Sequence, residues 1–153
     1  VAMGCHVTVL SRGTGKKDEA ILKLGAHDFV DCKDAADVAA HANTFNFVLD
    51  TIAAEHDMDM YLSMVRKHGK LCIVGVPSTP VKFSAFSIIG PRKSIVGSLV
   101  GGVPRTQEML NFCARHNIVS EIEMCDAKDV EAAYDRTVRS DVKYRFVIDT
   151  ATI

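Results

Sequence analysis

The stretch "HVTVLSRGTGKK", His6 to Lys17, joins an apolar, β-branched run to a polar and basic segment. The valine, threonine and leucine side chains favour a β-strand, and the serine that follows marks its end. An arginine, two glycines and two lysines then stand close together, and no acidic residue occurs before Asp18. The stretch therefore predicts a strand over residues 6–11 whose carboxyl end carries positive charge.

Similar apolar runs recur along the chain and predict buried parallel strands. The predicted strands are residues 6–11, 27–31, 45–50, 70–75 and 94–98. Helical stripes fill the gaps: a helix of residues 16–24 ends before Gly25, and a second, beginning near Met58, ends before Gly69. Pro104 opens a third helix, and residues 127–139 form a fourth. Residues 142–149 read as a last strand.

This alternation of strand and helix predicts an α/β fold, a doubly wound parallel sheet of the Rossmann-like kind. Such a domain begins with a strand and a G-x-G-x-x-G loop that holds a pyrophosphate. The chain instead begins with "VAMGCHV", which reads as the end of a helix and then a strand. Its densest glycine run, Gly97 to Gly102, has the wrong spacing. We therefore expect a doubly wound sheet that lacks its first strand and glycine-rich loop.

The amino-acid composition argues against several classes of protein function. The 153 residues are 48% hydrophobic with a net charge of −1, so no global basic field favours nucleic acid. No apolar run reaches the roughly 18 residues of a membrane span, and no signal peptide is indicated. Five cysteines without a C-x-x-C pair indicate reduced thiols. We expect a cytoplasmic protein without a membrane or nucleic-acid partner.

The basic segment after the first predicted strand fits an anion. In a doubly wound fold this position faces the adenosine ribose of a dinucleotide. A carboxylate 4 Å from a phosphate charge there would cost on the order of 4 kcal/mol, whereas lysine or arginine would attract it. The candidates for a 2′-phosphate site are therefore Ser11, Arg12, Thr14, Lys16 and Lys17. The alternative is a solvated loop that leads into a helix.

Three further strand ends carry polar residues or glycine. Asp50 and Thr51 follow one strand, Gly75 follows the next, and Ser98, Leu99 and Val100 follow a third. Because parallel strands end at one edge of a sheet, these residues predict a shared crevice. Taken singly, each is also explained as a helix cap or a turn.

No motif in the sequence indicates that this chain carries catalytic residues. The six histidines are scattered, and neither H-E-x-x-H nor G-x-S-x-G occurs. We therefore assign no catalytic and no metal-binding residue. Arg145, in the last predicted strand, could face either a ligand phosphate or the solvent.

Four runs together resemble a known family: "VLSRGTGKKDEAILKLGA", "FVLDTIAAEHDMDMYLSMVRKHGKLCIVGVP", "SIVGSLVGGVPRTQEMLNFCARH" and "DVKYRFVID". They resemble the medium-chain zinc alcohol dehydrogenases of the cinnamyl-alcohol-dehydrogenase type. The resemblance covers essentially the whole chain. It implies the NADP-binding part of a zinc-dependent, usually homodimeric oxidoreductase that interconverts primary alcohols and aldehydes by hydride transfer.

The resemblance also implies roles for individual residues. The segment Ser11 to Lys16 would bind the 2′-phosphate, with Ser11 and Lys16 as direct contacts. Arg12, Gly13 and Gly15 depart from the serine-rich and threonine-rich pattern that the family often has there. The remaining implied contacts are Thr51 at the adenosine or ribose, Gly75 at the nicotinamide ribose, Ser98 to Val100 at the carboxamide, and Arg145 at the pyrophosphate.

Other parts of the family pattern are expected before residue 1, namely the zinc ligands and the glycine-rich loop. Residues 1–140 would then be an incomplete NADP-binding domain, and residues 141–153 a strand that returns toward the catalytic domain. Strands 6–11 and 45–50 would flank a gap. We expect the chain alone to be inactive and to bind NADP weakly, and we expect the intact enzyme to dimerise through residues 94–98.

Two other functions stay open from the sequence. One is a zinc-free quinone or enoyl reductase of the same superfamily, which shares the nucleotide-binding domain. The other is a non-catalytic nucleotide-binding domain. The residues that precede this chain would distinguish the three.

Overall fold

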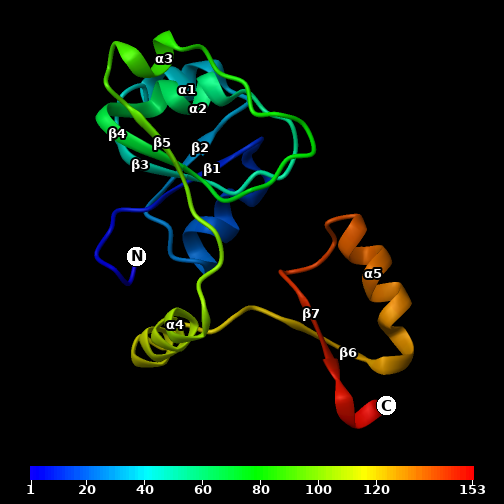
Figure 1. The fold of residues 1–153 in the computed structure, drawn as a ribbon. Helices are drawn as coiled ribbons and strands as arrows, with labels where there is room; N and C mark the ends of the chain where they lie inside the picture. The colour runs from blue at the N-terminus through cyan, green and yellow to red at the C-terminus, as the bar shows by residue number, and fades with distance from the viewer. The chain divides into compact units, whose positions relative to one another are not determined.

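The computed structural model describes residues 1–153, which form two compact units, Val1–Val100 and Gly101–Ile153. Figure 1 shows helices and strands alternating along the chain. None of the helices is long and apolar enough to cross a bilayer.

The first unit contains five strands, all paired in parallel. They are β1 (Thr8–Ser11), β2 (Asp28–Asp31), β3 (Phe45–Asp50), β4 (Val65–Ile73) and β5 (Ser94–Gly97). β1 pairs with β2, and β3, β4 and β5 form a separate sheet in that order. Each predicted strand is present within a few residues of its expected bounds, so the predicted parallel α/β fold is confirmed. As expected from the sequence, β1 and β3 are not hydrogen-bonded to one another.

Short helical segments connect these strands: η1 (Thr14–Lys16), η2 (Glu19–Lys23), α1 (Ala35–Ala40), α2 (Met58–Met64) and α3 (Phe86–Ile89). Asp34 and Asp57 cap α1 and α2, because each carboxylate accepts a backbone N–H of the first turn. The helix expected over residues 16–24 is confirmed, as a 3-10 turn (Thr14–Lys16) followed by a π-helical segment (Glu19–Lys23).

The expectation that Gly69 ends a helix was wrong. α2 ends at Met64, and Gly69 lies inside β4. A Cβ atom at Gly69 would lie 2.9 Å from the Asn46 carbonyl oxygen and 2.7 Å from Val65 Cγ1. The glycine is therefore explained by the close approach of β3 to β4.

One hydrophobic core supports both sheets of the first unit. Its fully buried side chains include Val30 of β2, Leu62 of α2 and Leu71 of β4. Leu10 of β1 packs against the same cluster. Side-chain packing therefore holds β1 and β2 beside β3 and β4 although no backbone ladder joins the two pairs.

The second unit contains α4 (Val103–Arg115), β6 (Glu123–Asp126), η3 (Ala127–Asp129), α5 (Val130–Val138), β7 (Phe146–Asp149) and η4 (Thr150–Thr152). Pro104 stands in the first turn of α4, as predicted. β6 pairs in parallel with β7 and was not predicted, because its sequence "EMCD" is short and half polar. The Arg136 guanidinium joins α5 to Glu123 of β6 at 2.8 Å.

Candidate functional site

The carboxyl ends of β3, β4 and β5 lie level with one another. Asp50 pairs with Ile73, and Ile73 pairs with Gly97, so the last residues of the three strands form one row. The Val74 and Gly75 amides donate to the Asp50 carbonyl oxygen at 2.9 and 3.1 Å. The predicted strand-end residues Thr51, Gly75 and Ser98 therefore follow a common sheet edge.

Gly75 allows the loop after β4 to approach the loop after β3. A Cβ atom at this position would lie 2.3 Å from the Ile52 carbonyl oxygen and 2.7 Å from the Ile52 nitrogen. These contacts are with backbone, which has no flexible end to move away. Residue 75 must therefore be glycine for the two loops to keep this arrangement.

A buried contact between Asp50 and His56 shapes the loop that carries Thr51. The Asp50 side chain is 3% exposed, and one carboxylate oxygen accepts the Ile52 N–H at 3.0 Å. The other lies 3.1 Å from His56 Nε2, while His56 Nδ1 lies 2.8 Å from the Ala54 carbonyl oxygen. Thr51 itself is exposed. His56 could not be predicted as part of the site, since a histidine six residues after an aspartate is no recognisable motif.

A small pocket adjoins this loop. It has a volume of about 30 Å³ and lies between residues 54–56 and residues 77–82, which follow β3 and β4. On the next strand, the Ser98 amide donates to the Ile73 carbonyl oxygen at 3.2 Å. Leu99 and Val100, which follow this strand, are 88% and 89% exposed.

The segment after β1 forms a tight basic loop. Ser11 pairs with Asp31 in the last row of β1 and β2, and Cys32 N–H donates to the Ser11 carbonyl oxygen at 2.8 Å. Gly13 N–H donates to the Asp31 carboxylate at 2.7 Å. The exposed residues of this segment are Arg12, Thr14, Gly15, Lys16 and Lys17. The predicted residues 11–16 are thus one continuous loop beside Asp31.

Tyr61 links the two sheets of the first unit, β1–β2 and β3–β4–β5. Its side chain is buried, and its ring lies edge-on to His56 with centroids 5.5 Å apart. Burial, with smaller contributions from Cys32 and Asp50, raises the pKa of Tyr61 to about 12, and the Arg12 charge opposes this rise. Arg12 after β1 and Asp50 at the end of β3 therefore both lie within electrostatic reach of one side chain.

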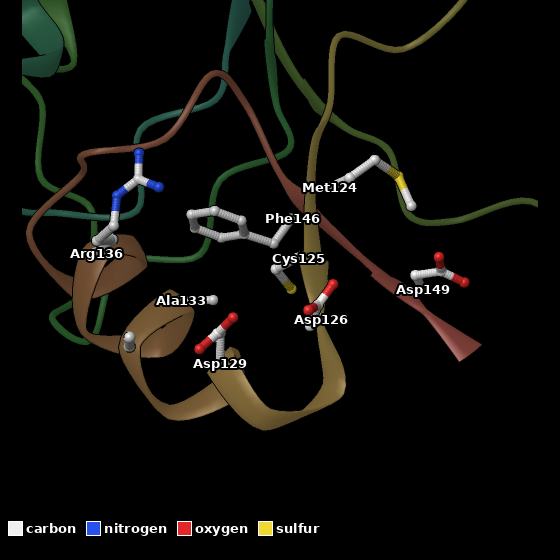
Figure 2. A pocket seen from close by; sticks show the side chains of 9 residues that line it. Met124, Cys125, Asp126, Asp129, Ala133, Arg136, Phe146 and Asp149 are labelled. Carbon is white, nitrogen blue, oxygen red and sulfur yellow. The ribbon is translucent and has the colours of Figure 1, made fainter. Parts of the chain in front are cut away.

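The second unit has a pocket of its own, which Figure 2 shows between β6, α5 and β7. Its volume is about 400 Å³, and the Arg136 guanidinium lies over the Phe146 ring at 4.8 Å. Three carboxylates also line it, those of Asp126, Asp129 and Asp149. Arg145 directly precedes β7, and its carbonyl oxygen accepts the Glu123 N–H at 2.9 Å. None of the predicted site residues lines this pocket.

No group of three or more histidine, cysteine, aspartate or glutamate side chains in residues 1–153 is arranged to hold a metal ion. The candidate site is therefore built from strand ends, exposed loop backbone and basic side chains. Such an arrangement can bind the phosphate and ribose groups of a nucleotide, and offers no metal centre of its own.

Comparison with known proteins identifies the family. The sequence profile described as zinc-binding dehydrogenase matches residues 1–115. The chain belongs to the zinc-binding dehydrogenase family. It corresponds to the C-terminal portion of a medium-chain alcohol dehydrogenase. The resemblance stated from the sequence is thereby confirmed.

Among the relatives of this chain, a probable formaldehyde dehydrogenase of Bacillus subtilis is 51% identical over 99% of the chain and 43% of its own length. An aldehyde reductase of Escherichia coli is 45% identical, with 99% of the chain and 44% of that protein covered. The chain therefore spans less than half the length of these relatives.

Solved structures agree with the dehydrogenase fold. A cinnamyl alcohol dehydrogenase of Sorghum bicolor superposes with a TM-score of 0.93 at 40% identity, over 98% of the chain and 42% of that protein. A second, from Helicobacter pylori, was solved in complex with NADP(H) and gives a TM-score of 0.81 at 34% identity, with the same coverage. The roles of the individual site residues stay predictions.

Proposed function

We propose that this chain is the NADP-binding part of a zinc-dependent dehydrogenase that interconverts primary alcohols and aldehydes. The names of its relatives support this reaction class, since they include an aldehyde reductase and cinnamyl alcohol dehydrogenases. The Helicobacter pylori structure with NADP(H) supports the coenzyme.

The observation that carries the proposal is the basic loop after β1. It presents Arg12 and Lys16 beside Ser11, at the position where a dinucleotide places its adenosine ribose. The Asp31 carboxylate, which contacts this loop, is engaged by two backbone amides. The loop thus offers cations to an extra phosphate, and a coenzyme without that phosphate would leave them unused.

The proposed contacts follow the sheet edge. Ser11 and Lys16 would hold the 2′-phosphate, Thr51 the adenosine side, Gly75 the nicotinamide ribose, and Ser98 to Val100 the carboxamide. Gly75 fits this role because its loop leaves no room for a side chain at the edge. The bound nicotinamide would accept or supply the hydride, and this chain would orient it.

We propose that the zinc ligands belong to a part of the intact enzyme outside these 153 residues. No step of the reaction is therefore assigned to a metal on this chain. Residues 141–153 would return toward that catalytic part, and Arg145 would reach the coenzyme pyrophosphate. The five free cysteines fit a reducing compartment, the cytoplasm.

The test is the coenzyme preference of the intact enzyme. We expect purified, zinc-loaded enzyme to reduce primary aldehydes with NADPH, with kcat/KM at least about tenfold higher than with NADH. Apoenzyme made with a chelator, then restored by added zinc, is the control for the metal. A preference for NADH, or full activity in the apoenzyme, would contradict the proposal.

We also propose that the intact enzyme is a homodimer. β5 is the outer strand of its sheet, and Val96 on it is 37% exposed. An outer strand offers unpaired backbone groups to a second copy, which would extend the sheet across a twofold axis. Light scattering of the intact enzyme should give twice the mass of one chain, and a monomeric mass would rule this out.

A further inference from the structure

Asp31 makes the contacts that order the basic loop. One carboxylate oxygen accepts the Gly13 N–H at 2.7 Å and the Lys33 N–H at 2.8 Å. The first contact spans 18 positions and joins the end of β2 to the loop after β1. Because a carboxylate accepts charge-assisted hydrogen bonds, these contacts are shorter and stronger than neutral ones.

The backbone of Asp31 is in turn hydrogen-bonded to helix α1. Its backbone N–H donates to the Asp37 carboxylate of α1 at 2.8 Å. The Asp37 carboxylate lies 3.3 Å from His41 Nδ1 at the end of the same helix. The position of the Asp31 carboxylate is therefore tied to α1 as well as to β2.

Gly13 has a backbone conformation that suits only glycine. Its φ of 85° and ψ of 159° lie in a region that side chains exclude. This conformation directs its N–H to Asp31 instead of leaving it for a ligand. The loop thus uses a special backbone geometry to make one specific contact.

The Asp31 carboxylate carries charge under ordinary conditions. Hydrogen bonds from the Lys33 and Gly13 amides hold its pKa below the usual range for aspartate. Ser11, the proposed phosphate ligand, is the partner of Asp31 in the last row of the two strands. A fixed negative charge therefore stands beside the site proposed for the doubly charged 2′-phosphate.

We propose that Asp31 is a positioning residue that tunes the preference of this site for NADP over NAD, an inference that rests on the proposed function. Its hydrogen bond to Gly13 holds the loop in the shape that places Ser11 and Lys16 around the phosphate. Its charge at the same time repels the phosphate. The two effects oppose one another, so two substitutions are needed to separate them.

The first substitution, Asp31→Asn, keeps an oxygen that can accept both amides and removes the charge. We expect it to strengthen NADP binding by the intact enzyme about fivefold, because the repulsion between the carboxylate and the phosphate is lost. NAD has no 2′-phosphate, so its dissociation constant should change less than about twofold.

The second substitution, Asp31→Ala, removes the charge and the acceptor together. Its comparison with Asp31→Asn isolates the hydrogen bonds, and we expect NADP to bind about tenfold more weakly to the alanine variant than to the asparagine variant. Hydrogen–deuterium exchange of the peptide spanning residues 11–17 should be faster in Asp31→Ala only.

The matched control is Asp34→Ala. Asp34 also accepts a backbone amide, that of Ala36 at 2.9 Å, but makes no hydrogen bond to the basic loop. We expect this variant to lose some stability of α1 and to keep both coenzyme affinities. The same loss of affinity in Asp34→Ala and Asp31→Ala would show a general loss of stability and would overturn the proposal.

The outcomes separate this inference from the proposed function. Isothermal titration of the intact enzyme gives all the affinities. If the unmodified enzyme binds NAD as tightly as NADP, the proposed coenzyme is wrong. If it prefers NADP but Asp31→Asn binds NADP no more tightly, or Asp31→Ala matches Asp31→Asn, the role of Asp31 is wrong while the function stands. Should Asp31→Ala not fold, the asparagine variant still decides.

Discussion

Lys16 and Lys17 are adjacent, exposed and equally charged, yet only Lys16 belongs to the proposed phosphate contacts. Lys16→Ala in the intact enzyme should raise the KM for NADPH about tenfold and leave the KM for NADH nearly unchanged, because one charge-assisted contact to the 2′-phosphate is lost. Lys17→Ala removes the same charge from the neighbouring residue and should change both values little. Equal effects of the two substitutions would show that the loop acts only through its net charge.

Gly75 is the residue at which the site tolerates least change. In Gly75→Ala the new Cβ would meet the Ile52 backbone at 2.3 Å, so the loops after β3 and β4 must separate. We expect a loss of about 3 kcal/mol in the free energy of unfolding, measured by denaturant titration, with reduced coenzyme affinity. Gly90 has open space around its Cα and a φ of −58°, so Gly90→Ala should be neutral or slightly stabilising. If Gly75→Ala were equally harmless, the close contact would have no role.

At the scale of elements, the sequence predicts a helix or strand well where its apolar run is long enough to show the period of that element. β3 was predicted with its observed bounds, because "FNFVLD" is a compact apolar strand before a polar end. The boundary between α2 and β4 was wrong, since Met64 and Val65 are both fully buried and hydropathy does not change there. β6 has too few apolar residues to be recognised.

The residues of the candidate site were likewise predictable from the sequence only in part. Residues at strand ends were predictable, because a parallel sheet brings its carboxyl ends to one edge. The contacts of Asp31 with Gly13 and of Asp50 with His56 were not predictable. They depend on how two loops lie in space, and no periodicity along the chain records that.

α2 carries a side chain whose ionisation should affect stability. Tyr61 has a pKa of about 12 in the folded chain, above the ordinary value of about 10, because it is buried near Cys32 and Asp50. The folded state therefore keeps the proton where the unfolded state has lost it. Stability is fully present below pH 10 and should fall as the pH rises toward 12.

The measurement is the free energy of unfolding of the intact enzyme between pH 9 and 12. Tyr61→Phe cannot ionise and should lack the part of the decline that is due to this residue. Tyr134 is 70% exposed, and Tyr134→Phe should show the same decline as the unmodified enzyme. If the curves of all three proteins run parallel, burial of the Tyr61 hydroxyl does not control stability.

At the scale of the whole molecule, the first unit is a parallel sheet interrupted between β1 and β3. The proposed coenzyme contacts lie on both sides of this interruption, with Ser11 and Lys16 after β1 and Thr51 after β3. No backbone ladder joins the two sides, and side-chain contacts, such as the packing of Leu10 on the shared core, keep them in place. A ligand that spans both sides must therefore fix their relative position when it binds, and this ordering reduces its affinity.

Residues 1–153 alone should consequently bind NADP weakly and show no dehydrogenase activity. We expect a dissociation constant well above about 1 μM by isothermal titration, against a tighter value for the intact enzyme in the same buffer. Lys16→Ala should weaken the affinity of the intact enzyme and have little effect on the weak binding of the isolated chain. Submicromolar NADP binding by the isolated chain would mean that its two sheets, β1–β2 and β3–β4–β5, already form a complete site. In that case a strand between β1 and β3 would not be needed to hold the coenzyme.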